Sequence, residues 1–361
     1  DLNWMAGSQY VYSFGKCIFM PADLTAGIEF NQDKLEDNMW GYHRTVDQKV
    51  NIGSAFFQNE WKNEHWGFLI GGRLDKHNLI DHVIFSPRAN LRYNPTENIN
   101  LRFSYSSGFR APQAFDEDLH VENVGGNVAM VELADNLKEE RSQSLSASAD
   151  IYHRFGAFQV NFLVEGFYTK LSDVFALTDG EVVDGILTRT RYNAPGARVM
   201  GLTLEGKMAY LTKFQVQAGV TLQQSHYSEP HVWNKEAPAV KKMMRTPNTY
   251  GYFTATYTPI KPLSIALSGT YTGSMLVPHE PVPGFLEKPI TVNTKDFFDI
   301  GLKAAYDFKL YKSMNLQVNA GVQNIFNAYQ NDFDKGADRD SGYIYGPSLP
   351  RSFFAGVKIS Y

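Results

Sequence analysis

The stretch Phe353-Phe354-Ala355-Gly356-Val357-Lys358-Ile359-Ser360-Tyr361, which ends the chain, decides the fold class. Apolar residues occupy every second position from Phe353 to Tyr361, and most of the residues between them are small or polar. Side chains alternate between the two faces of a β-strand, so this pattern predicts a strand with one apolar and one polar face.

The same alternation recurs along the whole chain, clearly at residues 214–223 and 316–323. Helical periodicity is hard to find, so the sequence predicts an all-β fold. We expect about fifteen strands, most of them longer than the five or six residues usual in soluble sheets. Their expected ranges are 2–14, 22–32, 46–60, 65–76, 83–94, 98–108, 139–154, 157–176, 187–210, 213–227, 246–258, 262–275, 295–308, 313–326 and 348–361.

Strand length and connection length favour a transmembrane antiparallel β-barrel. A tilted strand needs about nine to eleven residues to cross a bilayer, and the expected strands meet this length. Short links alternate with long ones, as in outer-membrane barrels. The short links are 61–64, 95–97, 155–156, 211–212, 259–261 and 309–312, and the long ones are 33–45, 109–138, 228–245, 276–294 and 327–347. A soluble β-sandwich binding module shows the same alternation and stays open as an alternative.

The odd strand number indicates an incomplete barrel, because bacterial single-chain barrels generally have an even number of strands. If the last strand ends in the periplasm, the first strand enters the membrane from outside. An open barrel would leave unpaired edges in lipid, which is very unfavourable. We therefore expect residues 1–361 to be part of a larger barrel, completed by further sequence or by another chain.

Composition excludes several other classes of protein. The chain has 34 Lys and Arg against 38 Asp and Glu, with a net charge of −4, so nucleic acid is not an expected partner. A single cysteine, Cys17, can form neither an internal disulfide nor a zinc site. No apolar stretch is long enough for a transmembrane helix, and no signal peptide opens the chain. Catalytic and cofactor-binding motifs are absent, so we expect neither an enzyme nor a cofactor.

Several segments of the chain carry motifs that point to one family. Residues 103–112 end in Phe-Arg-Ala-Pro, residues 134–140 include Leu137, Lys138 and Glu140, and residues 324–327 are Asn-Ile-Phe-Asn. The first of these resembles a strand-to-loop signature of the barrel of TonB-dependent outer-membrane receptors, and the second resembles the next motif of that family at the three named residues only. Residues 324–327 and 350–361 resemble the penultimate and last strands of that barrel, and residues 26–30, 56–61 and 71–75 resemble other strands of its C-terminal part.

The resemblance implies a location in the outer membrane of a Gram-negative cell and contact with outer-membrane lipid. It also implies that a plug domain, which contacts TonB, lies upstream with about seven strands of a roughly 22-stranded barrel. Such a receptor imports a scarce nutrient such as a ferric siderophore, haem or a corrinoid. A passive porin or an adhesin-type barrel is the alternative.

Candidate ligand-binding residues lie in the long links. The 109–138 link contains Arg110, the acidic run Asp116-Glu117-Asp118 and His120. The haem receptors of the resembled family carry a histidine between the same two motifs, and a neutral imidazole can ligate haem iron. His120 is therefore a candidate haem ligand, with a solvated loop histidine as the alternative.

Three other loops carry weaker signals. Residues 226–245 include His226, His231, Met243 and Met244, a set that suits copper or haem but lacks a metal-site spacing. His279 lies in a proline-rich stretch that is expected to be stiff. The carboxylates of Asp332, Asp334, Asp338 and Asp340 suit calcium, although their spacing is not that of a helix-flanked calcium loop and solvated acids are expected.

Charged residues within the strands are expected to point into the lumen, because facing lipid would cost about 2–4 kcal/mol for each Arg or Lys at the midplane. Their mixed signs favour hydrogen bonding to a polar plug over an ion-selective pore. They are Glu29, Arg73, Arg88, Arg92, Arg102, Asp150, Glu165, Glu205, Lys207, Asp299, Lys303 and Lys358.

Overall fold

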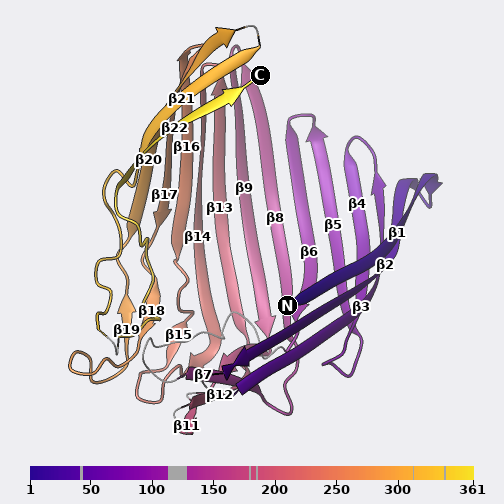
Figure 1. Cartoon of the computed structure of the whole chain (residues 1–361). Helices are drawn as coiled ribbons and strands as arrows, with labels where there is room; N and C mark the ends of the chain where they lie inside the picture. Colours follow the sequence, from indigo (N-terminus) through magenta and orange to yellow (C-terminus); the bar gives the residue numbers. More distant parts are fainter. Residues whose placement is uncertain (41–43, 113–127, 179, 184–185, 312, 337–338) are drawn as a thin grey trace.

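One large antiparallel sheet forms most of the molecule (Figure 1). The computed structural model describes residues 1–40, 44–112, 128–178, 180–183, 186–311, 313–336 and 339–361. Within these ranges the sheet contains 16 strands, and its neighbours follow the order of the chain except that β15 pairs only with β14. Each long strand hydrogen-bonds to the next, as in a barrel wall.

The strands of the large sheet are β1 (Leu2–Cys17), β2 (Met20–Met39), β3 (Arg44–Lys62), β4 (Trp66–His77), β5 (Ile84–Thr96), β6 (Ile99–Arg110), β8 (Glu140–Phe155), β9 (Phe158–Ser172), β13 (Ala197–Tyr210), β14 (Phe214–His231), β15 (Val240–Lys242), β16 (Thr249–Ile260), β17 (Leu263–Thr272), β20 (Phe297–Tyr311), β21 (Met314–Gln323) and β22 (Ser352–Ser360). Two smaller sheets contain β7 (Val128–Leu133), β10 (Val174–Leu177), β11 (Glu181–Val183) and β12 (Ile186–Ala194), and β18 (Leu276–His279) with β19 (Ile290–Asn293).

The prediction of an all-β fold with about fifteen long strands is confirmed, since every expected range overlaps a strand of the large sheet. Two ranges were wrong as single strands. The range 157–176 contains β9 and the first part of β10, and β10 lies in a separate sheet. The range 187–210 also contains two strands. Its first part is β12, which pairs with β10, β11 and β7 in a separate sheet. The break falls at Pro195-Gly196, where a Cβ atom on Gly196 would lie 2.1 Å from the carbonyl oxygen of Leu171.

The expected long link at 33–45 was also wrong. Strands β2 and β3 stay paired from Ala22↔Trp61 to Met39↔Arg44, so most of this range is strand. Its residues 33–38 are mainly charged and polar, which suggests a loop by composition. A paired strand tolerates such residues on both faces wherever both faces are solvated, so composition was a poor guide here.

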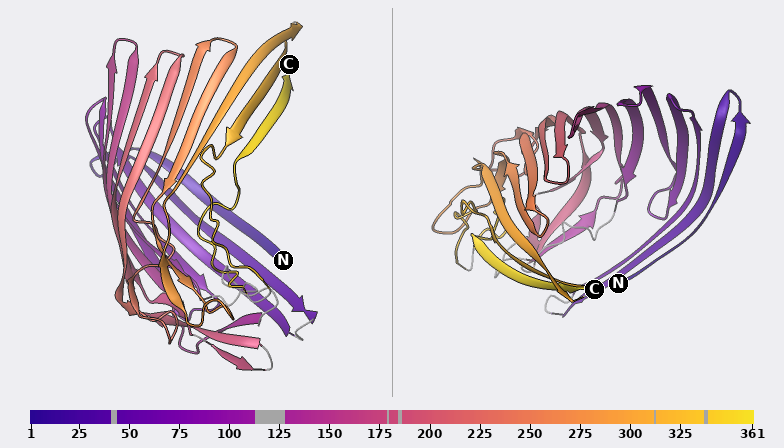
Figure 2. Two further views of the ribbon diagram at one scale, coloured as in Figure 1. Left: turned by 90° about the vertical axis from the view of Figure 1, so that its left-hand side faces the viewer. Right: turned by 90° about the horizontal axis from the view of Figure 1, so that it is seen from above.

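The pairing register sorts the side chains into an apolar face and a polar face. Residues directly opposite in antiparallel strands share a face, so Val164, Leu204 and Val220 lie together on one side. By the same rule the twelve charged residues expected in the lumen all fall on the other side. Figure 2 shows that the sheet curves strongly, so that one of its faces is concave and the other convex.

The two ends of the sheet differ as expected of a membrane barrel. At one end, which we call the short-turn end, hairpins are tight, and Gly156 adopts a φ of +60° in the turn between β8 and β9. The other end, the long-loop end, holds the smaller sheets and the long link 324–351 (Figure 1). Aromatic pairs such as Trp66–Tyr93 and Phe158–Tyr210, with ring centroids 4.2 and 4.7 Å apart, cluster near the short turns.

The edges of the large sheet are β1 and β22. Among the described residues these two strands pair with β2 and β21, respectively, and not with each other. No helix in the described part of the chain is long and apolar enough to cross a membrane.

Candidate functional site

The candidate ligand-binding residues from the sequence do not form one cluster in the structure. Asp116, Glu117, Asp118 and His120 lie outside the described residues. Arg110 lies against the ring of Phe175 at the long-loop end, and His231 lines the same recess as Phe175. His226 and His279 lie elsewhere. No group of three or more His, Cys, Asp or Glu side chains in the described part of the chain is arranged to hold a metal ion.

A recess of about 240 Å³ opens at the long-loop end around Phe175. Arg189 and Arg191 on β12 supply two guanidinium groups, Phe175 and Trp233 supply aromatic surfaces, and His231 ends β14 beside them. Guanidinium groups bind carboxylates, phosphates and other oxyanions, and they stack on planar rings. The recess therefore suits an anionic ligand that carries aromatic groups.

Arg110 and Glu140 attach this recess to the large sheet. Arg110 Nη2 lies 3.3 Å from Glu140 Oε2, and the same oxygen accepts the backbone N–H of Phe175 at 3.0 Å. The guanidinium carbon of Arg110 lies 4.8 Å from the centre of the Phe175 ring, and that of Arg191 lies 5.7 Å from it. Arg110 thus helps to position Phe175.

Two groups in the recess have unusual environments. Burial lowers the pKa of His231, so its ring is neutral at pH 7. The indole Nε1–H of Trp233 is buried and has no hydrogen-bond acceptor among the described residues. An unused buried donor is unfavourable, and a ligand oxygen in the recess would accept its hydrogen bond.

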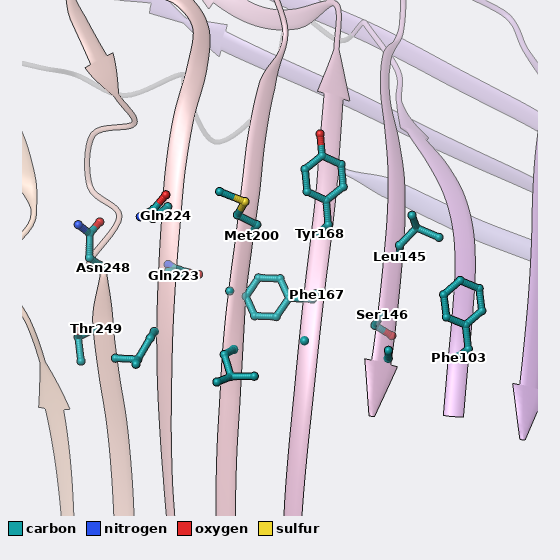
Figure 3. A pocket seen from close by; sticks show the side chains of 15 residues that line it. Phe103, Leu145, Ser146, Phe167, Tyr168, Met200, Gln223, Gln224, Asn248 and Thr249 are labelled. Atoms are coloured by element: carbon teal, nitrogen blue, oxygen red, sulfur yellow. The ribbon is translucent and has the colours of Figure 1, made fainter. Parts of the chain in front are cut away.

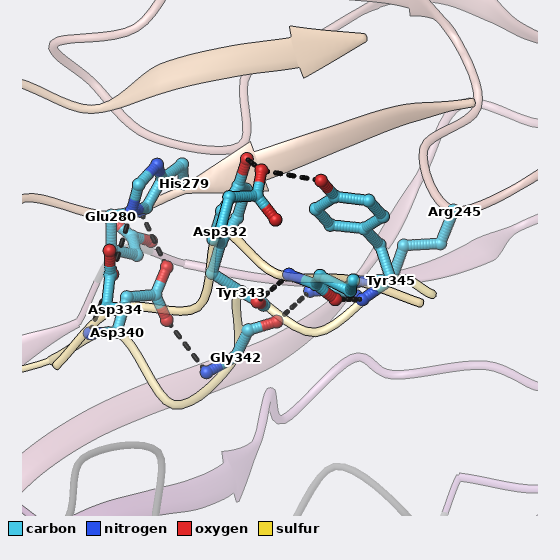
Figure 4. Close-up of polar contacts among 10 residues, drawn as sticks. Arg245, His279, Glu280, Asp332, Asp334, Asp340, Gly342, Tyr343 and Tyr345 are labelled. Carbon is cyan, nitrogen blue, oxygen red and sulfur yellow. Dashed lines mark hydrogen bonds and ion pairs between the residues drawn. The ribbon is translucent and has the colours of Figure 1, made fainter. Parts of the chain in front are cut away.

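His279 belongs to a separate polar network in the loops (Figure 4). Its Nε2 lies 2.8 Å from Asp334 Oδ2, and only 7% and 4% of the two side chains are exposed. The ring of His279 stacks on Tyr343 with centroids 3.8 Å apart. Arg245 Nη1 donates to the carbonyl oxygen of Ile344 at 2.7 Å. These contacts join the β18–β19 hairpin and the 232–248 link to the 324–351 link.

The aspartates of the 324–351 link were expected to be solvated acids. This holds for Asp332, which is exposed, but it was wrong for Asp334, whose side chain is only 4% exposed. Asp334 is buried against His279, and Asp340 accepts the backbone N–H groups of Glu280 and Gly342 at 2.9 and 2.8 Å. Asp332 Oδ2 accepts the hydroxyl of Tyr345 at 2.6 Å. Their partners His279 and Glu280 belong to the β18–β19 hairpin, which is distant in sequence and lies beside these aspartates only in the folded chain. Asp338 lies outside the described residues.

Burial and the negative charge of Asp332 raise the pKa of Tyr343 to about 12, and burial also raises the pKa of Tyr345. Both phenols are therefore protonated donors near neutral pH, as their hydrogen bonds to Asp332 require.

Two groups of charges on the polar face of the sheet form ion pairs within the described residues. Arg73 donates to Glu29, Ser54 and Asp75 at 2.9, 2.7 and 2.7 Å. Lys207 Nζ lies 2.7 Å from Glu205 Oε1, and Glu205 also accepts the hydroxyl of Tyr252.

Sequence analysis missed Phe175, Arg189, Arg191 and Trp233. Arg189 and Arg191 are two residues apart, so on a strand they share a face, and this signal was visible in the sequence. The positions of Phe175 and Trp233 beside them result from pairing between distant segments, which no local pattern reports.

Comparisons with known proteins agree with this geometry. Residues 1–325 match the family model described as TonB dependent receptor-like, beta-barrel. Similar solved structures include a ferric enterobactin receptor mutant from Pseudomonas aeruginosa (18% identity, TM-score 0.70, covering 98% of this chain and 53% of that one). Others are the siderophore receptor PirA from Acinetobacter baumannii (17%, 0.68, 98% and 54%) and the FrpB iron transporter from Neisseria meningitidis (16%, 0.65, 98% and 54%).

No curated protein sequence matches the chain. The chain spans about half the length of the solved structures that it matches. At these identities the structural likeness shows the fold, and the family model identifies the membership. The chain belongs to the TonB-dependent receptor-like β-barrel family.

Proposed function

We propose that this chain forms part of the barrel of an outer-membrane receptor that imports an iron chelate with energy delivered through TonB. The observation that carries the proposal is the match of residues 1–325 to the receptor barrel family, on a wall that has one apolar and one polar face. Further strands complete the barrel, and a plug domain that contacts TonB fills its polar interior.

The chemistry of the recess favours an anionic chelate with aromatic groups, such as a ferric siderophore. Arg189 and Arg191 provide cations, and Phe175 and Trp233 provide aromatic surfaces. The indole N–H of Trp233 has no acceptor within the part of the chain that the structure describes. The solved relatives named above include receptors for ferric enterobactin and other siderophores.

Uptake of a radiolabelled ferric siderophore by cells that produce the complete receptor tests this proposal. We expect uptake that saturates and stops when TonB is removed. In the Arg189→Gln/Trp233→Ala variant, binding to the purified receptor should weaken roughly tenfold or more, because a charge-assisted and an aromatic contact are lost. Arg154→Gln at the short-turn end is the control and should bind like the parent. Unchanged binding by the double variant would move the site elsewhere.

Haem remains a second candidate because of His120. A titration of haem into the complete receptor beside His120→Ala distinguishes the two ligands. A saturating Soret shift that weakens in the variant would identify a haem receptor, whereas the siderophore proposal predicts no such shift. A passive porin would take up its solute equally well without TonB.

A further inference from the structure

A hollow of about 860 Å³ opens on the apolar face over the middle strands (Figure 3). Its floor is Ala147 on β8 and Gly166 on β9, which are directly opposite each other. Phe103 on β6 and Leu202 on β13 stand on either side. A Cβ atom on Gly166 would have no atom within 4 Å. Since strands lie about 4.8 Å apart, the floor is wide enough for a hydrocarbon chain.

A row of basic side chains crosses the sheet directly beyond this hollow, toward the long-loop end. Lys170, Arg198, His226 and Lys242 occupy mutually opposite positions on β9, β13, β14 and β15, on the same face as the hollow. We call these four residues the basic row. The cations Lys170 and Arg198 lie directly opposite each other and repel. Among the described residues, no ion pair or hydrogen bond is made by these four side chains, so the basic row can contact an anion from outside the chain.

The depth of the basic row matches that of lipid headgroups. On β9 the residues facing this side alternate from Phe158 through Val164 to Tyr168, and Lys170 is the next one outward. Ten residue steps of about 3.4 Å, tilted by about 40°, span about 26 Å, close to the apolar band of outer-membrane barrels. The basic row thus stands just outside that band.

We propose that the basic row and the hollow together bind one phosphate-bearing lipid of the leaflet at the long-loop end. The headgroup phosphate contacts the cations, and an acyl chain lies over Gly166. The positive side chains favour a phosphate group. The apolar hollow favours a lipid over a free anion, because only a lipid has an acyl chain to place there. The site lies on the face of the sheet opposite to the import path, so it is independent of the transported ligand.

Native mass spectrometry of the complete receptor in detergent tests this inference, with dioleoyl phosphatidic acid and dioleoyl phosphatidylcholine as probes. We expect phosphatidic acid to bind with 1:1 stoichiometry and to resist competition by inorganic phosphate. Lys170→Gln/Arg198→Gln should weaken its binding about thirtyfold, since each cation near a lipid surface contributes about a factor of five. Lys303→Gln/Lys358→Gln makes the same charge change on the polar face and should bind like the parent.

Gly166→Leu tests the hollow separately. It should weaken phosphatidic acid binding about tenfold while all four basic residues remain, and heat-dependent migration of the barrel on gels confirms that the variant folds. Equal affinity for both lipids, an equal loss in the polar-face control, or displacement by inorganic phosphate would overturn the proposal. So would a dimer of the receptor that dissociates in the Lys170→Gln/Arg198→Gln variant, because the face would then bind a second copy.

Discussion

At the scale of single residues, the buried pair of His279 and Asp334 joins two loops that are far apart in sequence. We expect His279→Ala to destabilise the 324–351 link by about 1–3 kcal/mol, because it leaves a buried carboxylate short of a partner. Limited proteolysis of the complete receptor should show faster cleavage within this link. His65→Ala, which changes an exposed histidine at the short-turn end, should not alter the cleavage rate. Equal rates in both variants would show that the pair does not hold the loops.

The raised pKa of Tyr343 makes the same network sensitive to alkaline pH. A phenol whose pKa rises from 10 to about 12 on folding stabilises the folded state fully below pH 10, and this contribution is lost as pH rises from 10 to 12. Protease resistance of the 324–351 link should therefore fall over this window in the parent. Tyr343→Phe should be less resistant at pH 8 and should show a smaller decline between pH 10 and 12. A parallel decline in both proteins would exclude this role for Tyr343.

At the scale of one strand, β9 places Val164 and Glu165 on opposite faces near the centre of the wall. Val164→Arg should destabilise the inserted barrel by about 2–4 kcal/mol, because it exposes a charge to lipid at the midplane. Glu165→Arg, one residue along, faces the polar side and should be tolerated. The fraction of heat-modifiable barrel on gels measures both. Similar losses in the two variants would contradict the assignment of the faces.

At the scale of the whole molecule, the large sheet has two edge strands within the described residues, β1 and β22. Their unpaired edges support the proposal that more strands complete the barrel. In the complete receptor we expect the amides of β1 and β22 to exchange with deuterium as slowly as those of β9, since every strand in lipid needs a partner on both sides. Rapid exchange confined to β1 and β22 would mean that these edges stay open, and the larger barrel would have to be abandoned.

The sequence by itself determined the all-β class, the positions of most strands and the face on which each charged residue lies. These properties depend on a period of two residues, which is local, and lipid penalises any exception. The prediction from sequence failed where composition was ambiguous. It placed a link where β2 continues through polar residues, and it missed the end of a strand at Pro195-Gly196.

Only the tertiary structure decided which side chains meet. His279 and Asp334 are 55 residues apart, and Arg245 and Ile344 are 99 apart, so no local pattern links them. The recess around Phe175 and the basic row also arise from the register between strands. That register places Lys170 beside Arg198, and His226 beside Lys242, through backbone pairing that individual segments of sequence do not specify.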